Sequence, residues 1–164
     1  MPGEFPEIIA DLWTALGLPL PSFREGDSSA TLNVDGIAVT LSESRDRQHL
    51  VVSAKAGRLS ADPATQERQV AYLLGVGVAT LPTSRACSCL EDRDSPAPAV
   101  MVRAVIPLSV KAGARDHAFV MDQLVKAVSD VAYVGREHGP RLQSDGPRDP
   151  LPADLDSDMV VLRP

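Results

Sequence analysis

Cys87 and Cys89 are the only two cysteines of the sequence, and one residue separates them. This spacing differs from the C-x-x-C of zinc knuckles and thiol redox sites. On a strand, both side chains would share a face about 6.6 Å apart, a geometry that does not suit a disulfide. We therefore expect the pair to contribute to packing, and a thiol nucleophile in a small enzyme is the alternative.

The other residue types that carry chemistry do not form a known constellation. His49, His117 and His138 show neither HExxH nor HxH spacing. The segment Gly75-Val76-Gly77 is too short and too apolar in its context for a dinucleotide fingerprint, and the sequence has no Walker A loop or G-x-S-x-G elbow. Carboxylates cluster in the expected loops and at the C-terminal end, where solvation explains them. The sequence predicts no enzyme activity, no cofactor and no metal site.

Composition narrows the remaining functions. The chain has 164 residues, 44% of them hydrophobic and 4% aromatic, which predicts one domain with an aliphatic core. A formal charge of −6 argues against a protein that binds the phosphate backbone of nucleic acids. No apolar run approaches the roughly 20 residues of a membrane span, and no signal peptide is evident. With only two cysteines, we expect a cytoplasmic protein without membrane insertion.

The elements that must position any site begin with a hairpin in the stretch from Leu16 to Leu41. Apolar and polar residues alternate on both sides of Asp35-Gly36, a dipeptide typical of a two-residue type I′ turn. The apolar face consists of Leu32, Val34, Ile37, Val39 and Leu41. This pattern predicts two antiparallel strands that are half buried.

Three helices are predicted around the strands. Residues 6–16 form the first, which ends at Gly17 and carries Trp13 either in the core or as a partner anchor. Asp62-Pro63 opens the second, and Gly75 and Gly77 either end it or allow another helix to approach across a dimer. The third spans 114–137, with a long apolar stripe.

Further strands are expected at residues 50–56, 86–91 and 100–106. The resulting order is α-β-β-β-α-β-β-α, an α+β fold in which a twisted antiparallel sheet packs with three helices. We expect this domain to span residues 1–139. Residues 140–164 are rich in Pro, Asp and Gly, which predicts a flexible C-terminal tail.

This arrangement resembles class I type III secretion chaperones of the CesT and Tir-chaperone type over about residues 6–137. The family pattern comprises a first helix, L-G-L-x-x-L-x-F, an aliphatic hairpin, a Leu-Leu pair and a closing amphipathic helix. The corresponding positions are Leu16-Gly17-Leu18, Leu20 (one position before the Leu of the pattern), Phe23, Leu32, Val34, Val39, Leu41, Leu50 to Gly57, Leu73-Leu74, Ile106-Pro107-Leu108, Phe119, Leu124, Val128 and Val131. The sequence departs from this pattern at Gly75, where the family usually has Asn, and in a Pro-rich loop at 93–99.

The resemblance implies a homodimer that binds the N-terminal region of secreted effectors in the bacterial cytoplasm and keeps it extended. One effector segment would add as a strand to a free sheet edge. The secretion ATPase is a further partner that the resemblance suggests. The expected effector-binding residues are Leu12, Trp13, Leu16, Leu32, Val34, Val39 and Leu41. The expected dimer residues are Val70, Leu73, Leu74, Val100 and Val102.

Besides the chaperone hypothesis, two other functions stay open at this point. The same fold could serve a regulatory protein that binds a cytoplasmic partner and has no secreted client. All of the expected binding residues are apolar, so each could also pack in an internal core. The thiol enzyme described above is the third hypothesis.

Overall fold

A computed structural model describes residues 4–21, 28–108, 114–142 and 161–162. Phe23 of the family pattern and the side chain of His117 lie outside the described part. The helices are Glu4–Ala15 (α1), Pro63–Thr80 (α2), Ala114–His138 (α3) and the short 3₁₀ turn Gly139–Arg141 (η1). The strands are Ser29–Val34 (β1), Ile37–Glu43 (β2), His49–Arg58 (β3), Cys87–Glu91 (β4), Ala99–Pro107 (β5) and Val161–Leu162 (β6).

The strands form one sheet in the order β4-β5-β3-β2-β1-β6. β1, β2 and β3 follow one another as an antiparallel meander, and β5 pairs antiparallel with both β3 and β4. The predicted α+β fold with an antiparallel sheet and three helices is thus confirmed. The short β6 is an addition at the edge of the sheet, where it runs parallel to β1.

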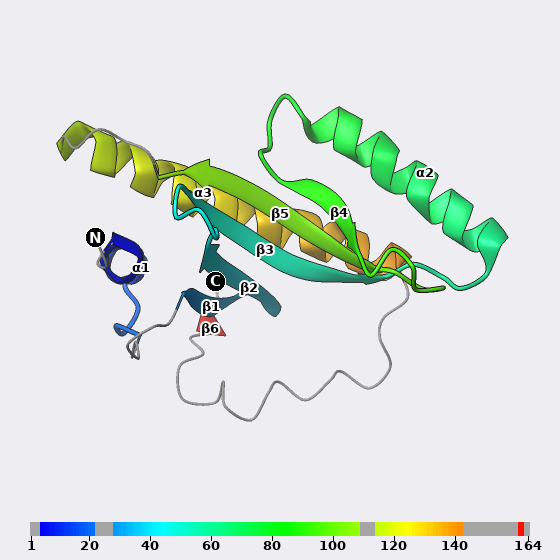
Figure 1. Cartoon of the computed structure of the whole chain (residues 1–164), viewed down its shortest axis with the longest axis horizontal. Coiled ribbons are helices and arrows are strands. Elements are labelled where there is room, and N and C mark those ends of the chain that lie inside the picture. Colours follow the sequence, from blue (N-terminus) through cyan, green and yellow to red (C-terminus); the bar gives the residue numbers. More distant parts are fainter. Residues whose placement is uncertain (1–3, 22–27, 109–113, 143–160, 163–164) are drawn as a thin grey trace.

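The helices cover different parts of this sheet (Figure 1). α3 packs against β2, β3 and β5 and lies behind the sheet in this view, and α1 contacts α3. α2 lies beside β4, at the end of the strand order opposite β1. The face of the sheet that α3 leaves uncovered carries a mixture of polar and apolar side chains, which an antiparallel sheet tolerates.

The predicted hairpin turn is present between β1 and β2. Asp35 has φ 51° and Gly36 has φ 83°, the positive values that a type I′ turn requires. The amide of Gly36 donates to Oδ1 of Asn33 at 2.8 Å. The turn chemistry therefore fixes the register, in which Leu32 pairs with Val39.

α2 begins as predicted and ends later than predicted. A carboxylate oxygen of Asp62 accepts a hydrogen bond from the amide of Thr65 at 2.9 Å, and Pro63 is the first helical residue. The prediction that the helix ends or loosens at Gly75 and Gly77 is wrong, because it continues to Thr80. Glycine weakens a helix by only about 1 kcal/mol relative to alanine, so the surrounding helical turns outweigh it.

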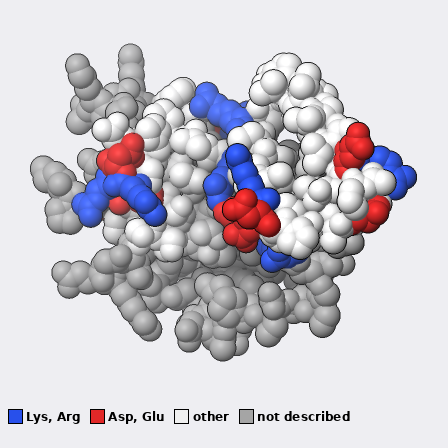
Figure 2. Space-filling view, turned by 45° about the vertical axis from the view of Figure 1, so that its right-hand side comes forward, with Lys and Arg blue, Asp and Glu red and all other residues white. Residues whose placement is uncertain are grey.

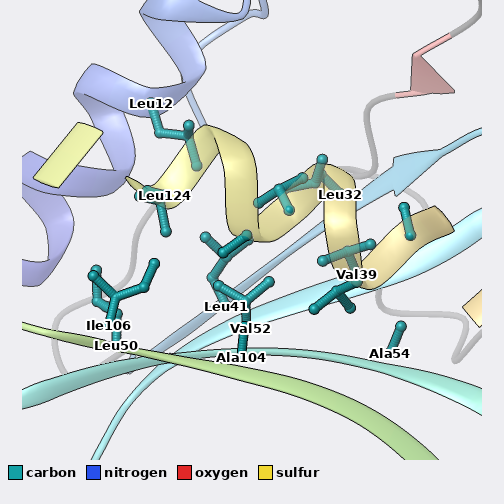
Figure 3. Close-up of a cluster of buried hydrophobic side chains, with 14 of the residues drawn as sticks. Leu12, Leu32, Val39, Leu41, Leu50, Val52, Ala54, Ala104, Ile106 and Leu124 are labelled. Carbon is teal, nitrogen blue, oxygen red and sulfur yellow. The ribbon is translucent and has the colours of Figure 1, made fainter. Parts of the chain in front are cut away.

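The main core lies between α3, α1 and one face of the sheet (Figure 3). Figure 3 shows side chains from α1, α3 and the strands β1, β2, β3 and β5 pointing into one cluster. Its labelled members are Leu12, Leu32, Val39, Leu41, Leu50, Val52, Ala54, Ala104, Ile106 and Leu124. The cluster is almost wholly aliphatic apart from Phe5 and Trp13, as the low aromatic content predicts.

A second, smaller core holds α2 to the rest of the domain. It contains Leu59, Leu73, Val100 and Leu142, all at most 8% exposed. Leu142 follows η1 and lies within the segment expected to be a tail. The chain is therefore packed up to this residue, and the remainder of the predicted flexible tail lies outside the described residues apart from β6.

Candidate protein-binding surfaces

The two cysteines lie on β4, at the edge of the sheet. Cys87 is exposed and Cys89 is half-buried, and both are free thiols. Burial raises the pKa of the Cys89 thiol, the largest of several effects, so less of it is present as the reactive thiolate. This direction is opposite to the lowered thiol pKa that activates a catalytic cysteine.

Ser88 and His138 form a side-chain pair whose types resemble part of a catalytic dyad. Ser88 Oγ lies 3.1 Å from His138 Nε2. His138 is 1% exposed, and its burial lowers the pKa of the imidazole. The Tyr72 ring meets the imidazole edge-on, with ring centroids 5.6 Å apart. The imidazole is enclosed by packing, whereas Ser88 is half-buried and lines a groove between α2 and β4, and we interpret the pair as a structural contact between β4 and the end of α3.

The portion of the chain that the structure describes contains no candidate metal centre. No group of three or more His, Cys, Asp or Glu side chains there lies close enough to hold an ion. His49 lies beside a single carboxylate, with 3.6 Å between its Nδ1 and Oδ1 of Asp46.

The expected effector-binding residues fall into two groups. Leu12, Trp13, Leu32, Val39 and Leu41 have no solvent exposure and form part of the main core. Such side chains cannot meet a partner while the core stays packed, so a direct contact role does not suit them. Leu16 and Val34 are partly buried and lie at the margin of that core.

The expected dimer residues are divided in the same way. Val100 and Val102 are fully buried within β5, and Leu73 is 8% exposed in the second core. Val70 is half-buried, and Leu74 is 66% exposed. Only the side chain of Leu74 stands fully on the surface of the single chain.

Leu74 belongs to an apolar stripe along α2 that sequence reasoning identified only in part. Val78 and Leu81 are 70% and 71% exposed, and with Leu74 they recur at the spacing of one helix face. The sequence from Gln69 to Ser84 contains no charged residue, and this signal could have revealed the stripe. We call Leu74, Val78 and Leu81 the α2 stripe.

A groove lies next to the α2 stripe, between α2 and β4. Its volume is about 300 Å³, and its walls are mostly apolar. The lining residues from β4 and the loop before it are Ala86, Cys87, Ser88, Cys89 and Leu90. The stripe and the groove together form one continuous apolar surface at the end of the sheet, because the stripe residues also line the groove.

Charge on the same side of the molecule is sparse and mixed. Figure 2 shows acidic and basic side chains in small groups of both signs, with uncharged surface between them. Ion pairs near β4 and its preceding loop include Arg103 with Glu91, across β5 and β4, and Lys126 with Asp130 at 2.9 Å, where the Lys126 amine also donates to the Thr83 carbonyl. Such local pairing leaves the apolar surface, rather than a charged patch, as the main candidate for recognition.

The sequence matches no protein-family model and no curated protein. Solved structures match over most of the chain. A chain of the HopA1–SchA chaperone–effector complex has a TM-score of 0.56 at 15% identity, covering 82% of this chain and 91% of that one. A chain of the ExsC–ExsE complex has a TM-score of 0.55 at 17% identity, covering 86% and 95%. The chain has the fold of the class I type III secretion chaperones. YbjN, a putative transcription regulator from E. coli, has a TM-score of 0.51 at 18% identity, covering 80% of this chain and 91% of YbjN.

The secretion-chaperone fold of this chain leaves two sheet edges with different surroundings. β4 forms one edge, next to the groove and α2. At the other end, β1 pairs with β2 along its whole length and with β6 at only Asn33 and Val34. Most of the outer side of β1 therefore has no strand neighbour among the described residues.

Within the described residues, no helix of this chaperone fold has the length and apolarity that crossing a membrane requires.

Proposed function

We propose that this protein is a type III secretion chaperone. It binds the N-terminal region of one or more secreted effectors in the bacterial cytoplasm and keeps that region extended, without catalysis. The observation that carries the proposal is the fold shared with a chain of a chaperone–effector complex, combined with an apolar surface that the single chain leaves uncovered. A disordered client gains affinity by wrapping a large area, which offsets the entropy lost on ordering.

The α2 stripe and its groove are the proposed dimer surface. Three large aliphatic side chains at 66–71% exposure on a helix face without charges are unusual for a surface that faces water. A second copy of the chain would present the same stripe, and a two-fold interface pairs a patch with itself. This keeps Leu74 and Val70 in the expected interface and adds Val78 and Leu81. Leu73 would support the interface from beneath.

The proposed client surface lies on the other side of the domain. Leu16 and Val34 are the expected client-contacting residues that retain exposure, and Val34 is on β1, whose outer side has no strand neighbour among the described residues except β6 at Asn33 and Val34. An extended client could pair with β1 through backbone hydrogen bonds, which demand little of the client sequence. The secretion ATPase remains a further proposed partner.

Light scattering tests the proposal when it is applied to the protein purified alone and to the protein purified after co-expression with candidate secreted proteins. A homodimer would have twice the chain mass of 17.4 kDa. Co-purification of an effector's N-terminal segment with that dimer would support the proposal. A monomer that retains none of the candidates would contradict it. The variant Leu74→Lys is the control that separates dimer loss from client loss, because it changes only the proposed dimer surface.

A regulatory protein of the same fold is the second candidate, and the likeness to YbjN favours it. Such a protein would bind a cytoplasmic partner and have no secreted client. Its formal charge of −6 makes a direct contact with a nucleic acid backbone unfavourable, so its partner would be a protein. Secretion assays separate the two: loss of the chain would reduce export of a bound effector only under the first proposal.

A further inference from the structure

The C-terminal end of the chain occupies part of the sheet edge at β1. Val161 and Leu162 form β6, which runs parallel to β1 with Asn33 opposite Val161 and Val34 opposite Leu162. The outer side of an edge strand presents unpaired N–H and C=O groups that attract another strand. At these two positions, the partner strand comes from the same chain.

We infer that the C-terminal segment around Val161 and Leu162 is an internal competitor for the β1 edge. It occupies backbone positions to which an extended apolar segment of a partner would otherwise pair. The partner's identity as a secretion client rests on the proposed function, whereas occupancy of the edge by the chain's own end does not. The segment thereby lowers the affinity of the β1 edge for any added strand until that strand displaces it.

The sequence of this segment suits strand pairing. Residues 159–162 read Met-Val-Val-Leu, and β-branched residues are enriched in strands. Asp154, Asp156 and Asp158 precede them, so the apolar run follows an acidic stretch. The segment thus has the sequence character that suits strand addition by a partner: an apolar run rich in β-branched residues.

The connection to the folded domain is long enough to reach the edge. Leu142 is anchored in the second core beside Val100 of β5, and 18 residues, 143–160, separate it from β6. Strands lie about 4.8 Å apart, so the distance across the sheet from β5 to β1 is roughly 15 Å. A chain of this length spans at most about 65 Å when extended, so the reach is ample.

The pairing is suited to displacement because it is short. β6 forms two residue pairs with β1, whereas β2 forms six. Parallel pairing is also slightly less stable per residue than antiparallel pairing. A tethered segment acts at an effective concentration on the order of millimolar, which maintains occupancy despite weak pairing. A longer partner strand would pair along more of β1 and replace it.

Hydrogen exchange on the full-length chain tests this inference. The double variant V161P/L162P removes both backbone N–H groups of β6. We expect amides within residues 31–34 to exchange at least about tenfold faster in this variant than in the natural chain, because the pairing with β6 that protects them is lost. A tenfold change corresponds to about 1.4 kcal/mol of protection free energy. V161T/L162T is the matched control, because it keeps both N–H groups and places a β-branched residue at each position, and it should retain protection.

A synthetic peptide of residues 155–164 supplies the second arm. Fluorescence anisotropy of the labelled peptide should show binding to the full-length V161P/L162P variant and at least about tenfold weaker binding to the natural chain. A peptide that carries both prolines should bind neither. Equal exchange in all three proteins, or equal peptide binding by the natural chain and the proline variant, would overturn the inference. Protection that disappears on dilution would also overturn it, because the segment would then come from a second copy.

Neither arm uses a secretion client, so failure of the proposed function leaves these results unchanged. Conversely, a confirmed client that binds the natural chain and V161P/L162P with equal affinity would support the proposed function and overturn the competitor role.

Discussion

Ser88 Oγ and His138 Nε2 lie 3.1 Å apart, although 50 positions separate the two residues in the sequence. The contact joins the edge strand β4 to the last residue of α3. Tyr72 of α2 meets the same imidazole edge-on, and the Arg141 guanidinium lies 4.4 Å above the Tyr72 ring. This cluster therefore links α2, α3 and β4 at the place where the proposed dimer surface is attached to the domain.

The buried imidazole of His138 predicts a loss of stability at mildly acidic pH. Burial, its largest cause, lowers the pKa of His138 below the ordinary value of 6.5 in the folded chain. The unfolded chain therefore binds more protons between the two pKa values, and the free energy of unfolding rises with pH across this window. Conversely, we expect this free energy to fall as the pH decreases below about 6.5, in urea unfolding at a series of pH values.

His138→Gln and His49→Gln are the paired variants for this measurement. Glutamine at 138 does not titrate, so the decline between pH 6.5 and the folded pKa should shrink, whereas His49→Gln should retain it. Hydrogen bonds lower the pKa values of Asp46 and Asp62 below 3.8, so their stabilisation is lost only in more acidic solution. A decline that is the same in the natural chain and His138→Gln would contradict the assignment.

Local signals in the sequence predicted most of the fold. Asp35-Gly36 determines the hairpin register through its backbone angles, and the apolar stripe of the 25-residue helix α3 runs from Val120 to Val134. Both signals depend on neighbours along the chain, so a single sequence contains them. β6 could not be predicted in this way, because a two-residue pairing with a distant strand leaves no periodic pattern.

The candidate binding residues were less predictable. An apolar helix face looks the same whether it covers its own core or a partner, so Trp13 could be assigned to neither from spacing alone. Its 0% exposure assigns it to the core. In α2, the glycines suggested an early end and hid the continuation of the stripe to Leu81, although the charge-free sequence indicated an apolar surface.

Leu73 is buried and its neighbour Leu74 is exposed, so an alanine variant of Leu73 should affect folding stability and one of Leu74 should affect dimer formation. Leu73 is 8% exposed, and Leu73→Ala should lower the free energy of unfolding by about 2–5 kcal/mol. Leu74 is 66% exposed, and Leu74→Ala should change the stability of the single chain by at most about 0.5 kcal/mol. Leu74→Ala should instead raise the dimer dissociation constant by about tenfold, the effect of an interface residue worth about 1.4 kcal/mol.

Sedimentation measures the dimer dissociation constant. Urea unfolding should be carried out at protein concentrations below this constant, because the stability of a dimer depends on protein concentration. Val105→Ala is the control, since Val105 is 51% exposed on the sheet and lies outside the α2 stripe. A dissociation constant that is insensitive to Leu74→Ala would contradict the proposed interface.

The two thiols should react at different rates with an alkylating reagent. Cys87 is exposed, whereas burial of the half-buried Cys89 raises its pKa and lowers its thiolate fraction. In the single-cysteine variants, we expect Cys87 to react faster than Cys89 near pH 8, as measured by mass spectrometry. Because Cys87 lines the groove, its labelling should slow as the protein concentration rises and the dimer forms. A Cys89 that reacts faster than free cysteine would instead support the thiol-enzyme hypothesis.

Alanine variants of Gly75 and Gly77 can distinguish the effect of α2 on stability from its proposed role in dimer formation. A Cβ at either position would meet no atom within 4 Å beyond the adjoining residues and the backbone of its own helix. Gly75→Ala and Gly77→Ala should therefore each raise the free energy of unfolding of the single chain by about 0.5–1 kcal/mol, through helix propensity. If a second α2 packs closely against these glycines, the added methyl groups should at the same time weaken the dimer.

Gly135→Ala in α3 provides the matched control for this experiment. Its Cβ would lie 3.7 Å from Ile37 Cγ2, an ordinary contact inside the domain, and far along the chain from the α2 stripe. This variant should gain stability without changing the dimer dissociation constant in sedimentation. If Gly75→Ala and Gly77→Ala behave in the same way as Gly135→Ala, the two α2 helices do not approach through these glycines, and the interface must then depend on Leu74, Val78 and Leu81 alone.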